Sequence, residues 1–286
     1  MRANGIDVWC ETVGDAGDPP LLMIMGLGAQ LIDWPPGFVE MLARRGFRVV
    51  LFDNRDSGLS AGFDELGLPD VAAIFGGDPS SAGYLLSDLA GDAAGLLKAL
   101  GIERAHVVGA SMGGMIAQQL TIDHPDLVAS LCSIMSTTGD RAVGHPTPDA
   151  AAVLMRAPAA SRDEAVANGV RAARVTGSPG YPAPLAELER RAAAKYDRGY
   201  RPAGTLRQYA AILASPDRTA GLREVTAPTV VIHGADDPLI TVSGGQATAA
   251  AVPGAGLEII AGMGHDLPVA LWPRLVDAIV ANIKRG

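Results

Sequence analysis

Residues 104–120, RAHVVGASMGGMIAQQL, carry the most informative pattern in the chain. The segment opens with a short apolar run and continues, after a Gly-Ala-Ser-Met-Gly turn, with the apolar spacing of a buried helix. A serine on a tight strand-to-helix turn needs neighbours with almost no side chain, and Gly109 and Gly113 meet that need. The pattern predicts a strand, a sharp turn that exposes the Ser111 hydroxyl, and a helix whose first N–H groups favour a nearby negative charge.

Strand and helix patterns alternate on both sides of this turn. Continuous apolar runs, typical of strands in a parallel sheet covered on both faces, occur at residues 21–25, 48–52, 128–135 and 228–232. Further strands are expected at 5–13, as part of an edge hairpin, and at 257–260. Helices are expected at 34–45, 86–100 with Ser87 as the N-cap, 245–252 and 272–283. This order predicts the α/β class, with a mostly parallel central sheet flanked by helices.

The pattern changes between residues 136 and 222. Strong strand signals stop, and residues 163–175, 185–196 and 205–214 have helical composition. Because the strand–helix alternation resumes afterwards, an insertion is favoured over a separate helical domain. We therefore expect a core formed by residues 1–135 and 223–286, and a helical lid, residues 136–222, over the end of the sheet where Ser111 is exposed.

A serine hydroxyl needs a base to become a nucleophile, and the base needs an acid that fixes its tautomer. The loops after the last two predicted strands supply both, in the order serine, acid, histidine. His265 lies in the glycine-rich loop GMGHD and is the predicted base. For the acid, Asp237 is preferred because it lies three residues past Gly234 and precedes Pro238, while the adjacent Asp236 stays open as the alternative.

The remaining histidines and one charged loop are interpreted as structural. The four other histidines are His106, His124, His145 and His233. The loop DNRDSGLS, residues 53–60, is rich in turn formers, and its Asp53 and Arg55 are expected to take part in a buried salt bridge with neighbouring loops rather than in catalysis.

Composition excludes several classes of function. A formal net charge of −8 without clustered Lys and Arg argues against nucleic-acid binding. The two cysteines, Cys10 and Cys132, lack metal-ligand spacing and are expected to be buried free thiols. The N-terminus lacks the apolar core of a signal peptide, and the apolar run 21–27 is too short to span a bilayer, so we expect a cytoplasmic protein without a membrane partner.

Five motifs together resemble the α/β-hydrolase fold and extend over nearly all of the chain outside the lid. They are Gly26 to Gly28, DNRDSGLS, HVVGASMGG at 106–114, HGADDP at 233–238 and GMGHDLP at 262–268. Within that superfamily, the combination of MGLG, DNRDSG, LREVTAPTVVIHGADDP and GMGH resembles the aclacinomycin methylesterase group, which removes a methyl ester from an anthracycline polyketide.

The resemblance implies an α/β-hydrolase fold with Ser111 as nucleophile, His265 as base and Asp237 as orienting acid. It also implies an oxyanion hole formed by the backbone N–H groups of Leu27 and Met112. One departure is visible. Where many relatives have His-Gly at the first oxyanion loop, this chain has Met-Gly, which makes the pocket floor more apolar without removing a main-chain donor.

The expected function is that of a serine hydrolase, a carboxylesterase or more narrowly a methylesterase, acting on a small-molecule ester with an apolar part. This chemistry requires no metal and no organic cofactor, and we expect a monomer or homodimer. The same triad would also serve an amidase, a lactonase or a C–C bond hydrolase, and an aminopeptidase if Glu187 and Glu189 of the lid bound an amine rather than facing solvent. A ligand-binding protein or lyase without hydrolytic turnover is a further alternative. Dehalogenase and epoxide hydrolase chemistry needs a carboxylate at position 111 and is excluded by Ser111.

Overall fold

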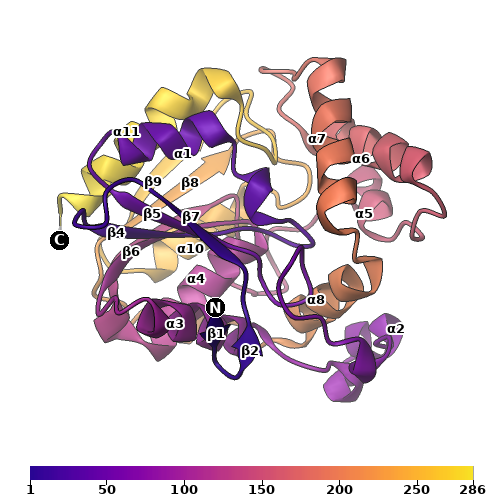
Figure 1. Ribbon diagram of the computed structural model, residues 1–286, viewed down its shortest axis with the longest axis horizontal. Coiled ribbons are helices and arrows are strands. Elements are labelled where there is room, and N and C mark those ends of the chain that lie inside the picture. Colours follow the sequence, from indigo (N-terminus) through magenta and orange to yellow (C-terminus); the bar gives the residue numbers. More distant parts are fainter. Residues whose placement is uncertain (286) are drawn as a thin grey trace.

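Seven strands form one sheet in the computed structural model, which describes residues 1–285 (Figure 1). Their spatial order is β3 (Cys10–Val13), β5 (Arg48–Phe52), β4 (Pro20–Ile24), β6 (Ala105–Ala110), β7 (Val128–Ile134), β8 (Thr229–Gly234) and β9 (Gly256–Ile260). β3 pairs antiparallel with β5, and every other pairing in this sheet is parallel. A separate hairpin joins β1 (Arg2–Ala3) to β2 (Ile6–Asp7). The predicted fold class is confirmed.

The central and edge strands of the sheet differ in burial. Residues 21–24 of β4 are completely buried, as expected for a central parallel strand covered on both faces. The edge strand β9 alternates instead, with Leu257 and Ile259 exposed. Position in the sheet therefore sets how completely each strand is buried.

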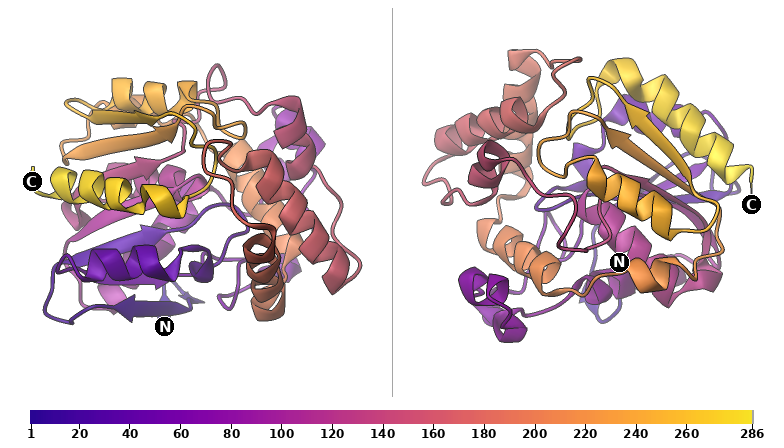
Figure 2. Two further views of the ribbon diagram at one scale, coloured as in Figure 1. Left: turned by 90° about the horizontal axis from the view of Figure 1, so that it is seen from above. Right: turned by 180° about the vertical axis from the view of Figure 1, so that it is seen from behind.

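Helices cover both faces of the sheet (Figures 1 and 2). Leu22 and Ile24 of β4 pack in one core cluster with α3 (Leu86–Ala99) and α4 (Met112–Asp123). Leu21 and Met23 point to the opposite face and pack with α1 (Pro36–Ala43) and α11 (Trp272–Ile283). α10 (Ser243–Ala251) connects β8 to β9. Short 3-10 turns connect other elements at Leu31–Asp33, Asp64–Leu66, Pro79–Ser81, Pro125–Leu127 and Val269–Leu271.

The chain between β7 and β8 forms a group of helices beyond one end of the sheet, and the two further views agree on this placement (Figures 1 and 2). They are α5 (Pro148–Leu154), α6 (Arg162–Thr176), α7 (Leu185–Gly199) and α8 (Pro202–Ala214), whereas the short helix α9 (Thr219–Leu222) packs beside the sheet against α10 and the C-terminal end of α4. The three helices expected here correspond to α6, α7 and α8. The short helices α5 and α9, like α2 (Val71–Phe75), were not predicted.

Buried polar contacts attach these inserted helices to the core. Arg198 of α7 pairs with the buried Asp53 at 2.8 Å, and Arg207 of α8 pairs with the buried Asp56 at 2.7 Å. The Arg55 guanidinium pairs with Asp92 of α3 at 2.6 Å. Asp53 and Arg55 are thus structural, as expected, but their charged partners lie on helices α7 and α3 rather than on neighbouring loops.

Three local predictions need correction. α3 begins at Leu86 with Leu85 as its N-cap, so Ser87 lies inside the first turn; the carboxylate of Asp88 accepts the N–H of Leu85 at 2.8 Å. The opening strand predicted over 5–13 is divided into β2 and β3. Both cysteines are free, but only Cys132 is buried and Cys10 is half-buried. Within residues 1–285, no helix has both the length and the apolar character needed to cross a bilayer.

Candidate active site

Ser111 lies at the turn between β6 and α4 with φ 58° and ψ −122°, a conformation that a residue with a side chain adopts only under constraint. The flanking glycines are required by packing. A Cβ on Gly109 would lie 2.1 Å from the carbonyl oxygen of Gly113, and a Cβ on Gly113 would lie 1.9 Å from that of Ile24. The predicted strand, sharp turn and helix are therefore present, and close backbone contacts explain both glycines.

Ser111, His265 and Asp237 form a continuous hydrogen-bonded series. The imidazole Nε2 of His265 lies 2.9 Å from Ser111 Oγ, and its Nδ1 lies 2.7 Å from Asp237 Oδ2. The other oxygen of Asp237 accepts the N–H groups of Leu239 at 2.8 Å and Ile240 at 3.0 Å. Because these contacts fix the carboxylate, it holds the imidazole in one orientation, with Nδ1–H donating and Nε2 facing the serine.

The adjacent acid points elsewhere. Asp236 Oδ2 accepts the N–H of Gly262 at 2.7 Å, and Asp236 is exposed, whereas Asp237 is 3 % exposed. The side chains of these two consecutive residues point in different directions, and only Asp237 contacts His265.

His233 lies closer to this series than the sequence indicated. It is completely buried, its Nε2–H donates to the carbonyl of Ile240 at 2.7 Å, and the same nitrogen lies 3.5 Å from Asp237 Oδ2. Burial lowers the pKa of the His233 imidazole, which therefore favours its neutral form. The other histidines lie apart from the series: His106 bonds Ser130, His124 caps the end of α4 and His145 is exposed.

Two backbone N–H groups beside Ser111 have no acceptor. Met112 is the first residue of α4, and Leu27 lies in the loop that follows β4. Neither N–H donates a hydrogen bond within residues 1–285. The loop passes directly beside the serine, because a Cβ on Gly26 would lie 3.1 Å from Ser111 Cβ. The N–H of Gly28, by contrast, is occupied by Gln208 Oε1 at 2.7 Å.

A pocket of about 410 Å³ opens beside Ser111 and His265. Its wall is mainly apolar and includes Met25, Leu27, Met115, Met135, Ile212 and Leu213. Four charged side chains interrupt this wall, namely Asp33, Arg191, Lys195 and Asp266. The pocket is thus shaped for an organic molecule with a large apolar part and few polar groups.

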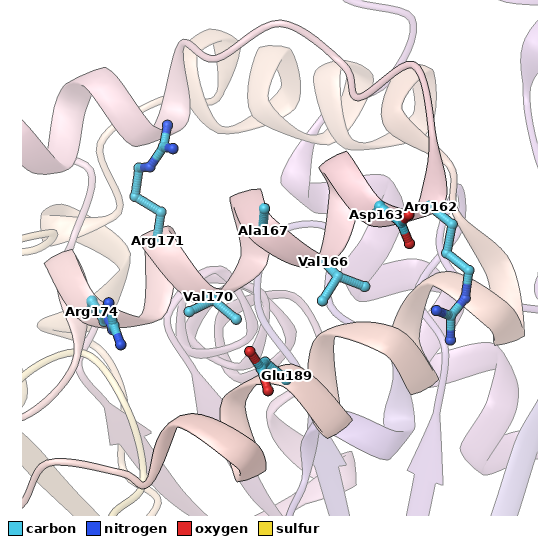
Figure 3. A pocket seen from close by; sticks show the side chains of 8 residues that line it. All are labelled: Arg162, Asp163, Val166, Ala167, Val170, Arg171, Arg174 and Glu189. Carbon is cyan, nitrogen blue, oxygen red and sulfur yellow. The ribbon is translucent and has the colours of Figure 1, made fainter.

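A second hollow of about 500 Å³ lies between α6 and α7, and all of its lining residues belong to those two helices (Figure 3). Figure 3 shows Glu189 of α7 beside Val170 of α6 in this groove. Glu187 is bound by Arg190 of its own helix at 2.7 Å. Neither glutamate lines the pocket beside Ser111, so neither offers the amine-binding carboxylate that an aminopeptidase needs there.

The connection between α6 and α7 contacts the loop that carries His265. The backbone N–H of His265 donates to the carbonyl of Thr176 at 2.7 Å, and the N–H of Gly264 donates to Ser178 Oγ at 2.8 Å. Ser178 Oγ in turn donates to Asp266. Burial raises the pKa of the Asp266 carboxyl. No local pattern in the sequence predicts these contacts, because the paired residues lie more than eighty positions apart and no motif surrounds Ser178.

No cluster of three or more His, Cys, Asp and Glu side chains arranged to hold a metal ion occurs in the described part of the chain.

The family model for the alpha/beta hydrolase fold matches residues 19–269. The chain belongs to this family. Among curated proteins, the α/β-hydrolase is similar to rhodomycin D methylesterase DauP of Streptomyces sp. (strain C5), with 30 % identity over 99 % of this chain and 97 % of the relative. Rhodomycin D methylesterase DnrP of Streptomyces peucetius is 29 % identical over 98 % of this chain and 95 % of its own length.

A solved structure supports the fold of this α/β-hydrolase. The esterase EaEST from Exiguobacterium antarcticum superposes with a TM-score of 0.76 and 18 % identity, over 99 % of this chain and 98 % of the esterase. The expected membership of the superfamily and the resemblance to the aclacinomycin methylesterase group are confirmed by the family model and the two full-length relatives.

Proposed function

We propose that this α/β-hydrolase is a serine esterase that cleaves a carboxylic ester through an acyl-enzyme. The observation that carries the proposal is the hydrogen-bonded series from Ser111 Oγ to His265 to Asp237, with separations of 2.9 Å and 2.7 Å. Both separations lie within the range needed for proton transfer between a nucleophile, its base and the acid that orients the base. The strained turn at Ser111 supports the same role, because strain of this kind is concentrated at functional positions.

The geometry suits acyl transfer in two steps. Ser111 Oγ attacks the ester carbonyl carbon while His265 Nε2 accepts the hydroxyl proton, and the imidazolium is stabilised by Asp237. The oxygen that becomes negative is placed to accept the N–H groups of Leu27 and Met112, which have no other acceptor. His265 then gives its proton to the departing alcohol. Water, activated by the same imidazole, cleaves the acyl-enzyme and releases the acid.

The substrate we propose has an apolar body and a small alcohol group. The pocket beside Ser111 is mainly apolar, which favours a substrate that buries hydrocarbon surface. The two full-length relatives are named methylesterases, which supports a methyl ester as the bond cleaved. An amide, a lactone or a C–C bond would use the same three residues, so a panel of these substrates has to accompany the esters.

We further propose that residues 136–222 act as a lid on a core formed by the rest of the chain. Leu154 of α5, Arg191 of α7, and Tyr209 and Ile212 of α8 all line the pocket that contains Ser111. The inserted helices thus supply one wall of the pocket, while the loops after β4, β6, β8 and β9 supply the other.

The direct test is the hydrolysis of p-nitrophenyl butyrate under pre-steady-state conditions. The wild-type protein is expected to release a burst of nitrophenol, because acylation precedes a slower hydrolysis of the acyl-enzyme. Ser111→Ala is expected to abolish the burst and to lower turnover on the order of 10⁶-fold, as loss of a triad serine does elsewhere. Ser80→Ala, at an exposed serine, is the control and should behave as wild type. Unchanged turnover by Ser111→Ala would refute the proposal.

A further inference from the structure

Four charged side chains line the pocket beside Ser111, and they differ in whether they have a partner of opposite charge. Arg191 and Lys195 come from α7 and lie four residues apart, which places both on one face of the helix. The carboxylates in the same lining are Asp33 and Asp266. Two cations and two carboxylates could pair with each other, and the distances between these four side chains show which pairs form.

Lys195 has a partner within the protein. Its Nζ lies 3.5 Å from Asp33 Oδ2, and the same oxygen accepts the backbone N–H of Gln30 at 2.8 Å. This pair lies at the rim of the pocket, where Lys195 and Asp33 keep 39 % and 19 % of their side-chain surface exposed. The charge of Lys195 is therefore largely offset without a ligand.

Arg191 has no such partner. Within residues 1–285, no carboxylate lies within 4.0 Å of its guanidinium and no hydrogen bond is made by it. The two neighbouring carboxylates are held by other groups. Glu187 is bound at both oxygens by Arg190, at 2.7 and 2.9 Å, and Asp266 is held by the hydroxyl of Ser178.

The Arg191 side chain is half-buried in a mainly apolar wall, and its guanidinium is free to form hydrogen bonds with an anion that enters the pocket. A planar guanidinium offers paired N–H donors that match the two oxygens of a carboxylate. The Thr137 hydroxyl lines the same pocket and is also buried without a hydrogen-bond partner. The lining thus offers donors that an anionic ligand would satisfy.

We infer that Arg191 is a specificity-determining residue that binds a carboxylate of the substrate, so that the preferred substrate is the half-ester of an apolar dicarboxylic acid. The inference rests on the proposed esterase function. The ester group lies at Ser111, the hydrocarbon body lies against the methionine and leucine side chains, and the free carboxylate pairs with Arg191. Hydrolysis then releases an alcohol and a dicarboxylate.

Two series of p-nitrophenyl esters test this inference. The first consists of half-esters of adipic, suberic and sebacic acid, and the second of esters of the matching monocarboxylic acids, which lack the charge. The wild-type protein should show a kcat/KM at least about tenfold higher for the best half-ester than for its neutral counterpart, since a charge-assisted hydrogen bond contributes about 1.5–3 kcal/mol. The readout is the ratio of the two kcat/KM values.

Arg191→Gln should collapse this ratio toward one, mainly through a higher KM for the half-ester, and Arg191→Lys should retain part of it. Arg171→Gln is the matched control. Arg171 is exposed on α6 and forms no salt bridge in the described chain. It lines the hollow between α6 and α7, where Figure 3 shows its side chain directed away from α7, but not the pocket beside Ser111. The control removes the same charge from the inserted helices and should leave the ratio unchanged.

A binding experiment separates recognition from turnover. Calorimetric titration of the Ser111→Ala protein with monomethyl suberate should give tighter binding than the same titration of Ser111→Ala/Arg191→Gln. Equal affinity of the two proteins, or a wild-type preference for the neutral esters, would overturn the role of Arg191 while leaving the esterase proposal intact. Failure of the wild-type protein to cleave any member of either series would overturn both.

Discussion

Gly26 shows how closely the backbone approaches the serine. A Cβ at this position would lie 3.1 Å from Ser111 Cβ, 3.3 Å from the carbonyl oxygen of Ala110 and 3.5 Å from Ser111 Oγ. The first two distances are shorter than an ordinary van der Waals contact, and the carbonyl oxygen of Ala110 belongs to the backbone and cannot rotate away. The loop that presents the N–H of Leu27 therefore depends on a residue without a side chain at its first position.

Gly26→Ala is expected to lower kcat by about 100-fold, because the displaced loop weakens one oxyanion donor. Stability should change much less than activity. Gly17→Ala is the matched control, since a Cβ at Gly17 meets no atom within 4 Å and the residue does not need a left-handed backbone. Steady-state kinetics and thermal unfolding of both variants check this prediction, and equal activity of the two variants would contradict it.

His233 links the site to the pH dependence of stability. Burial lowers the pKa of this imidazole in the folded protein, while the unfolded chain retains an ordinary histidine pKa of about 6.5. The unfolded state therefore binds more protons as the pH falls below about 6.5, and the wild-type protein loses stability in that direction. A single such group contributes at most about 1.4 kcal/mol per pH unit.

The stability difference between wild type and His233→Gln should therefore narrow as the pH is lowered from about 7.5 to about 5.5. Urea unfolding of both proteins at several pH values measures this difference in the free energy of unfolding. The effect of His106, whose pKa burial also lowers, is present in both proteins and cancels. A difference that widens at low pH would show instead that the folded state holds a protonated His233 against Asp237.

At the scale of elements, the inserted helices are joined to the core in two different ways. α7 and α8 are held by buried ion pairs, Arg198 with Asp53 and Arg207 with Asp56. The connection between α6 and α7 is held by hydrogen bonds to the loop that carries His265. The position of the base therefore depends on the connection between α6 and α7.

Ser178 is the side chain on which this dependence rests. Ser178→Ala leaves the buried N–H of Gly264 without an acceptor, which costs about 1–3 kcal/mol, and releases Asp266. We expect a severalfold lower kcat with a smaller change in KM, because the His265 loop loses its orientation. Ser178→Thr retains the hydroxyl and should restore most of the kcat. Equal losses of kcat in the two variants would contradict a role for the hydroxyl.

The sequence predicts most elements because their patterns are local. Continuous apolar runs marked the central strands, and the glycine-flanked serine marked the turn before α4. Local patterns do not predict contacts between residues that are distant in the sequence. The attachment of Gln208 to the N–H of Gly28 and to the carbonyl of Arg55 spans more than 150 residues, and no periodicity reports it. The cap of α3 was misplaced because Ser87 has the composition of an N-cap but lies within the helix.

At the scale of the whole molecule, the sheet gathers residues that are far apart in the chain. β6, β8 and β9 run parallel, so the loops at their carboxyl ends lie at one edge and bring Ser111, Asp237 and His265 together. Topology predicted this convergence from the sequence alone. The sequence also favoured Asp237 over Asp236, but only coordinates exclude the alternative, because the two adjacent side chains differ in direction.

The central claim is that Ser111 is a nucleophile activated by His265, and covalent labelling tests it most directly. A fluorophosphonate should transfer its phosphorus to Ser111 Oγ as the P–F bond breaks and fluoride leaves, giving one adduct per chain by intact-protein mass spectrometry. Peptide mapping should place the adduct on Ser111, Ser111→Ala should remain unlabelled, and His265→Ala should label far more slowly. An adduct on another residue, or labelling of Ser111→Ala at the wild-type rate, would contradict the claim.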